Sequence, residues 1–174
     1  MNVDVNDWSR PGLELVGFRG FVPFDGLDAA EVSQGPGVYV VVRPNTGVPE
    51  FLAESPAGWF KGRNPSVSVG RLGDSWVTDV SLVYIGKAAS GRTGRAGLRR
   101  RLATYRRHGA GEPVGHWGGW FIWQLADSGR LLVAWLETPG QDPEAIESYL
   151  LAEFASAHGR LPFANLKRGK VAAD

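Results

Sequence analysis

Two runs of apolar residues predict the first two strands of a buried sheet. Residues 37–43 follow a Gly-Pro-Gly turn signal and are rich in β-branched residues. Residues 81–87 have the same character, and each run contains one tyrosine. This composition and length favour buried strands. Between the runs, residues 44–80 are rich in Gly, Pro and Ser and too long for a hairpin turn, so we expect an insertion with short elements of its own.

A third and a fourth strand are predicted at residues 119–125 and 131–138, joined in a hairpin by residues 126–130. Alternate side chains point to opposite faces of a strand, and both faces of residues 119–125 are apolar. This pattern indicates a sheet that is covered on both sides. We therefore expect the tryptophans of this region to belong to the core: Trp117, Trp120, Trp123 and Trp135.

Helical periodicity predicts a helix from about residue 97 to residue 108, and a Gly-rich, basic, flexible loop at residues 88–96 leads into it. The narrow apolar face of this helix consists of Leu98, Leu102 and Tyr105. Arg100 and Arg107 point away from that face, whereas Arg101 lies beside it. We expect Arg101 to enter the space that the sheet and this helix enclose. The other two arginines should remain solvated or contact backbone phosphates.

A second helix is predicted from Pro143 to about His158, with Asp142 as its N-cap and Gly159 as its stop. Its apolar stripe consists of Ile146, Leu150, Phe154 and Ala157. Glu147 lies at the edge of this stripe. Removing a carboxylate from water is costly unless the group is paired, hydrogen-bonded or bound to a cation. Two interpretations remain open: Glu147 binds a metal ion, or it turns to solvent or pairs with an arginine.

Composition is typical of a single globular domain, residues 1–174, because 43% of the chain is hydrophobic. The absence of cysteine excludes disulfides, thiolate zinc sites and thiol catalysis, and the histidines show no metal-ligand spacing. No apolar run approaches membrane-spanning length, and the start lacks a signal sequence. We therefore expect a cytoplasmic protein without a membrane partner.

Charge is distributed unevenly along the chain, although the net charge is only +1. Residues 1–34 form an acidic extension with six carboxylates against two arginines. Residues 87–107 contain eight cations and no acid: Lys87, Arg92, Arg95, Arg99, Arg100, Arg101, Arg106 and Arg107. Uncompensated cations repel one another, which favours a phosphate-bearing partner over a merely solvated helix. We expect one face of the molecule to attract nucleic acid.

Five short motifs follow one another along the chain: Gly37-Val38-Tyr39, Val83-Tyr84-Ile85-Gly86-Lys87-Ala88, Leu98-Arg99-Arg100-Arg101-Leu102 with Tyr105, Glu147, and Asn165. Their order, over residues 35–166, resembles that of the GIY-YIG nuclease superfamily. The resemblance implies an α+β domain in which a small antiparallel sheet of three to four core strands is flanked by helices. It also implies hydrolysis of phosphodiester bonds in DNA with one Mg2+ or Mn2+ ion on Glu147. RNA and branched DNA remain alternative substrates.

The resemblance further implies roles for individual residues. Arg101 would stabilise the charge on the reacting phosphorus group, and the metal on Glu147 would stabilise the leaving oxygen. Tyr39 would orient or deprotonate the attacking water, because Lys87 or Arg101 nearby would lower its pKa from about 10. The catalytic set is Tyr39, Tyr84, Lys87, Arg101, Tyr105, Glu147 and Asn165. These residues should converge on one cleft.

The expected substrate contacts are Arg92, Arg95, Arg99, Arg100, Arg107, Lys61, Arg63 and His116. In the insertion, Lys61, Arg63 and Arg71 are interleaved with Trp59, Phe60 and Trp76, which suits either a grip on backbone and unpaired bases or a small core under a loop. His116 is a candidate second base or phosphate contact, or a structural histidine. We expect a monomer or homodimer. The alternative function is a catalytically idle nucleic-acid-binding or partner-binding module that retains the fold.

Overall fold

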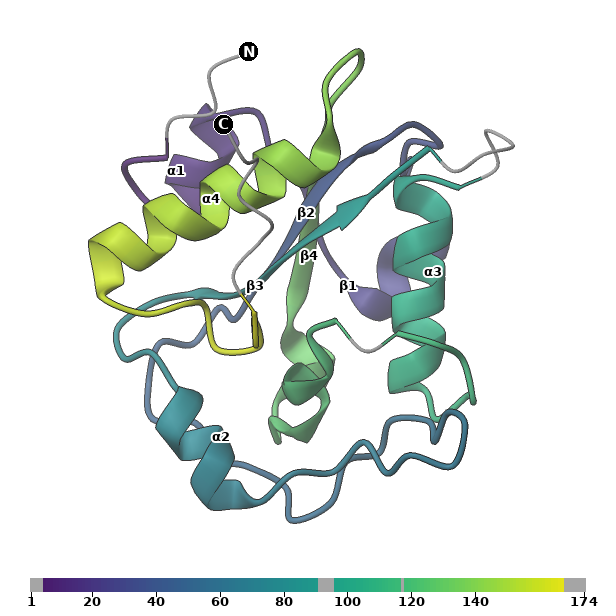
Figure 1. The fold of residues 1–174 in the computed structure, drawn as a ribbon, viewed down its shortest axis with the longest axis vertical. Helices are drawn as coiled ribbons and strands as arrows, with labels where there is room; N and C mark the ends of the chain where they lie inside the picture. The colour runs from purple at the N-terminus through teal and green to yellow at the C-terminus, as the bar shows by residue number, and fades with distance from the viewer. Residues whose placement is uncertain (1–4, 91–95, 117, 168–174) are drawn as a thin grey trace.

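The fold is α+β and is built around one four-stranded antiparallel sheet (Figure 1). The computed structural model describes residues 5–90, 96–116 and 118–167. The strands are β1 (Arg19–Pro23), β2 (Gly37–Val42), β3 (Leu82–Ala88) and β4 (Leu132–Glu137). They lie in the order β1-β4-β2-β3, so β3 is an edge strand. The predicted antiparallel sheet with flanking helices is confirmed.

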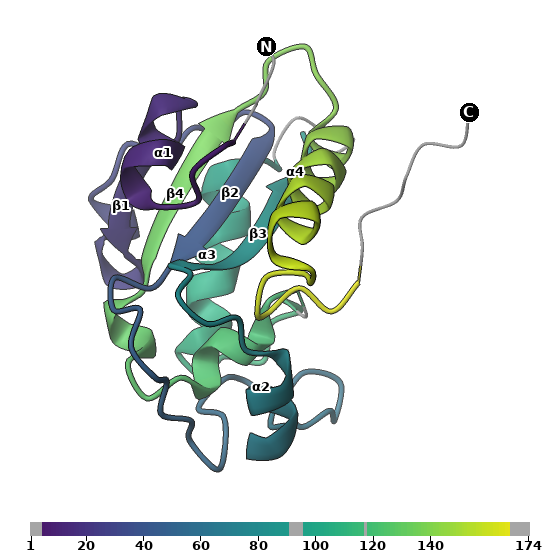
Figure 2. The same cartoon turned by 90° about the vertical axis from the view of Figure 1, so that its left-hand side faces the viewer.

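Helices cover both faces of the sheet (Figure 2). α1 (Arg10–Leu15) and α4 (Pro143–His158) cover one face, and α3 (Leu98–Gly109) covers the other. Valines at even-numbered positions of β2 pack with α1 and α4, and its odd-numbered residues pack with α3. Because both faces are buried, β2 and β3 read as continuous apolar runs in the sequence.

The two predicted helices of the sheet layers are confirmed, with ends within a residue or two of the expected ones. α3 begins after Gly97, whose φ of 125° favours glycine. α4 begins after Asp142, whose side chain accepts a hydrogen bond from the Glu144 amide, and ends at the left-handed Gly159. Among the residues that the structure describes, no helix is long and apolar enough to cross a membrane.

The register of β2 and β3 explains the glycine of the second motif. Tyr39 lies opposite Gly86, and Val41 lies opposite Tyr84. A Cβ atom at position 86 would lie 2.5 Å from Cζ of Tyr39 and 2.8 Å from Cε1 of Tyr84. Only glycine leaves room for the Tyr39 ring here, so the two strand motifs form one packing unit.

The predicted hairpin is wrong in its first half. Residues 119–125 contain a 3-10 helix, η2 (Trp120–Gln124), which begins after the left-handed Gly119. Its buried side chains join the cluster that includes α3 and part of the insertion. The second half of the hairpin is confirmed as β4. Periodicity alone cannot separate a short buried strand from a short buried helical turn.

The tryptophans around this segment agree in part with the expected core positions. Trp123 and Trp135 are buried, and Trp120 is partly exposed. Trp117 lies outside the described residues. The apolar composition of the segment therefore predicted burial better than it predicted the type of element.

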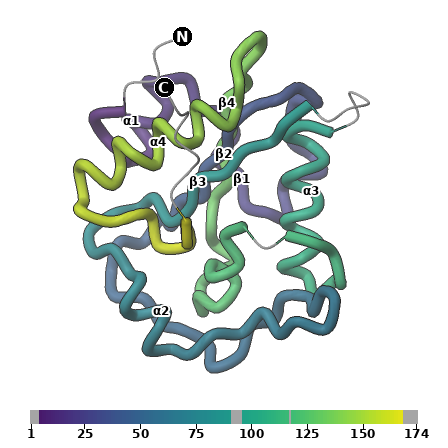
Figure 3. Tube along the Cα trace, viewed as in Figure 1, coloured from purple at the N-terminus to yellow at the C-terminus, as the bar shows by residue number. Residues whose placement is uncertain are grey.

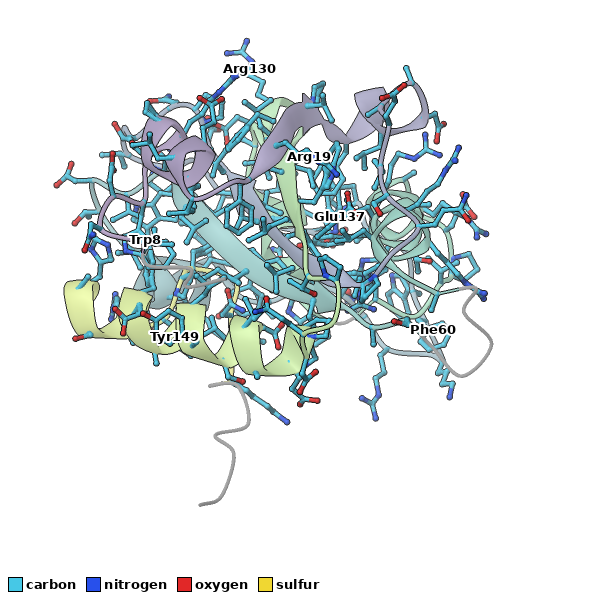
Figure 4. The ribbon with its side chains drawn as sticks, turned by 90° about the horizontal axis from the view of Figure 1, so that it is seen from above. Trp8, Arg19, Phe60, Arg130, Glu137 and Tyr149 are labelled. Atoms are coloured by element: carbon cyan, nitrogen blue, oxygen red, sulfur yellow. The ribbon has the colours of Figure 1, made fainter. Side chains whose placement is uncertain are left out.

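The acidic extension contributes a strand to the sheet. β1 pairs with β4 and supplies the second edge. Arg19 of β1 also forms an ion pair with Glu137 of β4, and Figure 4 shows these two labelled side chains close together. Sequence patterning missed β1, because Gly20 and Phe21 adopt positive φ and interrupt the alternation.

The insertion at residues 44–80 crosses one end of the molecule, as the trace from β2 through α2 to β3 shows in Figure 3. It contains α2 (Val69–Ser75), which confirms the expected short element. Gln124 of η2, which is fully buried, joins two distant points of the insertion. Its side-chain nitrogen donates to the carbonyls of Leu52 and Val67, each at 3.0 Å, and its oxygen accepts from the Val67 amide at 2.8 Å. Residues 52–67 therefore form a loop with clamped ends.

Candidate functional site

Most of the predicted catalytic residues meet around the edge strand β3. Tyr84 and Lys87 leave opposite faces of β3. A cleft of about 520 Å³, which we call the first cleft, is lined by both of them together with Gly118, Glu144, Glu147 and Asn165. α4 and the segment after it therefore bring acidic and amide side chains to a strand more than fifty residues earlier in the chain.

A second cleft of about 540 Å³ adjoins the first and shares Lys87 with it. It is lined by residues of α3, including Arg100, Arg101 and Thr104, and by the segment after β3. The two clefts together place one cationic wall from α3 beside one acidic wall from α4. Lys87 lies at the boundary between them.

Tyr39 lies beneath the clefts and does not line either of them. Its side chain is 0% exposed. Arg101 donates a hydrogen bond from Nε to the Tyr39 hydroxyl oxygen at 3.3 Å, and the Tyr39 and Tyr84 hydroxyl groups are hydrogen-bonded to each other. The Tyr39 oxygen therefore fixes the directions of two side chains that do reach the clefts.

The expected lowering of the Tyr39 pKa is wrong. Burial raises the pKa of Tyr39, and the opposing effect of the Arg101 charge is smaller. Burial also raises the pKa values of Tyr84 and Tyr105 well above the usual value for a phenol. All three hydroxyl groups therefore remain protonated at neutral pH, and none of them is poised to act as a base.

Arg101 carries a charge that no carboxylate neutralises in the described part of the chain. It is partly exposed on α3, and its polar contact is the Tyr39 hydroxyl. A Cβ atom at position 118 would lie 3.5 Å from its Nη2 and 2.5 Å from the Tyr84 hydroxyl, so the Gly118 backbone closes over both groups. The guanidinium is thus held in one place with donors to spare for an anion.

Glu147 has an ionic partner, as its position in the helix predicted, and that partner is a lysine. Its side chain is 13% exposed, and its Oε2 lies 2.8 Å from Nζ of Lys87. Glu144, one turn earlier on α4, places Oε1 at 3.2 Å from the same nitrogen. Partial burial disfavours the charged lysine, but the two carboxylates, Glu147 first, outweigh it and raise the Lys87 pKa.

Glu144 was not among the predicted site residues. The signal that points to it is the spacing of three residues from Glu147, which places both carboxylates on one face of α4. Two carboxylates converge on one ammonium nitrogen, so this corner of the first cleft is already built around a cation.

The chemistry of these donors fits a divalent ion. Mg2+ is typically held through one or two carboxylates and retains several of its waters, so a larger cluster of acids is not required. Within the described ranges, no group of three or more His, Asp or Glu side chains is arranged to hold a metal. Glu147, with Glu144 beside it, is therefore the candidate position for the expected Mg2+ or Mn2+.

Asn165 and Tyr105 support the walls of the first cleft. Asn165 donates from Nδ2 to the Ile85 carbonyl at 2.8 Å and accepts from the Ile85 amide at 2.9 Å, so it completes the free edge of β3 like a neighbouring strand. Tyr105 donates to the Gly119 carbonyl at 2.6 Å. Both side chains hold backbone segments that line the cleft, which makes them positioning residues.

The predicted substrate contacts are found in different environments. Arg99, Arg100, Lys61 and Arg63 are exposed, and Arg63 lines the first cleft. Arg107 is also exposed but pairs with Glu112 at 2.6 Å. Arg92 and Arg95 lie outside the described residues.

His116 does not occupy the expected position of a phosphate contact. Its side chain is 1% exposed and stacks on Tyr105, with ring centroids 3.9 Å apart and an angle of 7° between the ring planes. Burial, together with the charge of Arg101, lowers the pKa of His116 well below the usual value. A neutral, buried imidazole fits the structural role that the sequence left open.

Comparisons of the chain with models of protein families, with curated proteins and with solved structures found no match. The functional assignment therefore depends on the chemistry of the residues around the two clefts.

Proposed function

We propose that this protein is a metal-dependent endonuclease that hydrolyses phosphodiester bonds in DNA, as the resemblance of its motifs to the GIY-YIG superfamily implies. One observation carries the proposal. Tyr84, Lys87, Arg101 and Glu147, which come from three separate elements, surround two adjoining clefts with a fixed, unneutralised guanidinium on one side and two carboxylates on the other.

Phosphate binding is assigned to the boundary of the two clefts. Arg101 and Lys87 supply cationic donors there, and Arg100 extends the cationic wall. In the transition state, negative charge increases on the oxygens of the reacting phosphate, and preoriented cationic donors stabilise it. Arg101 suits this role best, because Tyr39 holds its Nε and leaves its terminal nitrogens free to bind.

The attacking water is assigned to Tyr84. This side chain lines the first cleft, whereas the fully buried Tyr39 cannot reach it. A phenol oxygen has lone pairs that accept hydrogen bonds, so the Tyr84 hydroxyl can accept one from water while it stays bonded to Tyr39. Tyr39 thus acts through its neighbours. It orients Tyr84 and Arg101, and its high pKa makes it a hydrogen-bonding group and not a base.

The divalent ion is assigned to Glu147, with Glu144 adjacent. A bound Mg2+ or Mn2+ would stabilise the charge of the leaving oxygen and orient the phosphate. Glu144 offers the Lys87 ammonium a second carboxylate, so Lys87 need not lose all its ionic contacts when Glu147 binds another cation. Lys87 would therefore keep one carboxylate partner if Glu147 bound a metal ion.

A second candidate is a nucleic-acid-binding module without catalysis. One observation favours it: the Lys87–Glu147 pair satisfies the carboxylate without a metal. Under this alternative the clefts bind phosphate through the same arginine, but the ion pair persists and no bond is broken.

A plasmid-nicking assay separates the two candidates. The purified protein should convert supercoiled DNA to the open-circular form with Mg2+ or Mn2+, and excess EDTA should abolish the conversion. An Arg101→Gln preparation, purified in parallel, controls for contaminating nucleases and should be inactive. Cleavage that persists in EDTA, or that the Arg101→Gln protein retains in full, would contradict the proposal. DNA binding without nicking in either metal would support the idle module.

A further inference from the structure

The insertion carries a short turn whose side chains are aromatic and basic. The turn comprises residues 59–63 and reads Trp-Phe-Lys-Gly-Arg; we call it the aromatic turn. Trp59 is 57% exposed, and Lys61 and Arg63 are exposed as well. Trp76, elsewhere in the insertion, is buried. The expected small core under a loop therefore describes Trp76, whereas Trp59 presents a large apolar ring to solvent.

The aromatic turn has a defined backbone conformation. Lys61 and Gly62 both adopt positive φ, at 52° and 70°, and the Arg63 amide donates to the Phe60 carbonyl at 3.1 Å. Two consecutive left-handed residues at the centre of a hydrogen-bonded hairpin turn are the signature of type I′. Such a turn holds the residues on either side of it in fixed directions.

The aromatic turn is anchored to the rest of the molecule on both sides. The Gly58 amide donates to the His108 carbonyl of α3 at 2.8 Å, and a Cβ atom at Gly58 would overlap the Glu112 backbone. The Phe60 ring lies against Gly115, where a Cβ atom would be 3.0 Å from the ring. Figure 4, which views the molecule from above, labels Phe60 near its periphery. The Phe60 ring thus anchors the turn by packing against Gly115, and Trp59 beside it faces solvent.

The aromatic turn lines the first cleft through Arg63 and packs against one residue of the second. Arg63 lines the first cleft, together with Tyr84, Lys87 and Glu147. Gly115, against which Phe60 packs, lines the second cleft together with Arg101. Arg63 thus brings one cation of the aromatic turn to the cleft to which the reacting water is assigned, and the exposed indole of Trp59 belongs to the same short turn.

We propose that the aromatic turn binds an unpaired nucleobase by stacking it on Trp59, while Lys61 and Arg63 hold the flanking phosphates. The preferred ligand is then single-stranded or locally unpaired nucleic acid. The proposal rests on the proposed function insofar as the same strand continues into the clefts. Stacking on an aromatic ring tolerates any base and requires a base face that no neighbouring base covers, which a paired duplex does not offer. The clamped ends of residues 52–67 reduce the ordering cost of binding.

Fluorescence anisotropy with labelled oligonucleotides in EDTA tests the proposal without cleavage. The probes are a 20-nucleotide oligothymidine, a strand of the same length with abasic sites at every position, and a 20-base-pair duplex; each is at least about one site size long for a small domain. The parent protein should bind oligothymidine at least about fivefold more tightly than the abasic strand, because both carry the same phosphates and only one offers bases to stack. The duplex should bind more weakly than oligothymidine.

Trp59→Ala is the variant and Tyr149→Ala is its matched control. Tyr149 is 41% exposed on α4. It lies two residues after Glu147, a rotation of about 200° around the helix, so the two side chains are on opposite sides of α4. Trp59→Ala should weaken oligothymidine binding about fivefold or more and leave abasic-strand binding unchanged, whereas Tyr149→Ala should match the parent. Equal melting temperatures for parent and variant show that the exposed change leaves the fold intact.

Three outcomes would overturn the proposal. The parent protein could prefer the duplex, or the Trp59→Ala protein could bind oligothymidine as tightly as the parent does. The parent could also be a dimer that Trp59→Ala converts to a monomer, and the indole would then be a contact between copies. The result of the nicking assay is independent of these binding results. Base-dependent binding without nicking would refute the nuclease and keep the aromatic turn, and nicking with an unchanged Trp59→Ala affinity would do the reverse.

Discussion

At the residue scale, glycines shape the clefts as much as the larger side chains do. The Tyr39 ring occupies the space above Gly86, and the Tyr84 hydroxyl lies under Gly118. Tyr39 is in turn hydrogen-bonded to Arg101 and Tyr84, the two side chains that reach the clefts. These close approaches fix the geometry of the clefts before any ligand binds.

Gly86→Ala tests this packing. The added methyl group would lie 2.5 Å from the Tyr39 ring, so the variant should lose about 1–3 kcal/mol of unfolding free energy and the bonds of Tyr39 should loosen. Gly73→Ala is the control, because that helical position has open space and should be neutral or gain up to about 1 kcal/mol. Urea unfolding measures both. A Gly86→Ala protein as stable as the parent would show that Tyr39 is not packed as described.

The burial of His116 should make the stability of the protein depend on pH. Burial holds the His116 pKa well below 6.5 in the folded protein, so below about pH 6.5 the unfolded chain binds a proton that the folded protein excludes. The free energy of unfolding therefore has its full value above the pKa of His116 in the unfolded chain, and it decreases as the pH falls below that pKa. His116→Phe keeps an aromatic ring on Tyr105 and removes this titration.

Urea unfolding between pH 7.5 and pH 5.5, a range that brackets the ordinary histidine pKa, measures the effect. The stability of His116→Phe should decline less steeply than that of the parent. His158→Phe is the comparison, because His158 is less buried and its pKa is also lowered, but less strongly. An unchanged slope for His116→Phe would mean that this imidazole is not excluded from water.

At the element scale, the insertion is connected to the core through one buried amide. Gln124 of η2 bonds the backbone of Leu52 and Val67 and so sets the length of the loop that bears the aromatic turn. Patterning predicted an apolar strand at this segment and treated Gln124 as one more alternating residue. A lone polar side chain in an apolar run is the sequence signal that was available, since such groups are buried only with partners.

Gln124→Leu should lower the unfolding free energy by about 2 kcal/mol or more, because three partly buried backbone bonds lose their partner. Limited proteolysis should then cut within residues 52–67 faster than in the parent, since the loop ends are no longer joined. Gln141→Leu, at an exposed position, is the control and should leave both measurements unchanged. Parent-like proteolysis of Gln124→Leu would show that other contacts hold the loop.

At the scale of the whole molecule, local patterns predicted those parts of the fold that local physics determines. The runs that became β2, β3 and β4 and the two capped helices are examples. β1 was missed, because its alternation breaks at Gly20 and Phe21, and η2 was predicted as a strand. Both errors concern short segments whose conformation depends on tertiary contacts.

Charge was the least predictable property, because ion pairs join distant parts of the chain. Arg106 pairs with Asp28 of the acidic extension and Lys87 pairs with Glu147, whereas Arg107 pairs with the nearby Glu112. Among the described residues of this segment, the cations without a carboxylate partner are Arg99, Arg100 and Arg101 of α3. The sequence also predicted the wrong direction for the Tyr39 pKa, because the depth of its burial could not be known from spacing.

The rate of DNA cleavage by Glu147→Gln, at saturating DNA and Mg2+, tests whether Glu147 holds a catalytic metal ion. Glu153→Gln, on the same helix and outside the clefts, is the matched control. The substitution keeps the size of the side chain and removes the charge that would hold the cation. We predict a loss of at least about a hundredfold in rate, with DNA affinity retained and with Glu153→Gln at the parent's rate. A Glu147→Gln protein that cleaves DNA as fast as the parent would contradict the account.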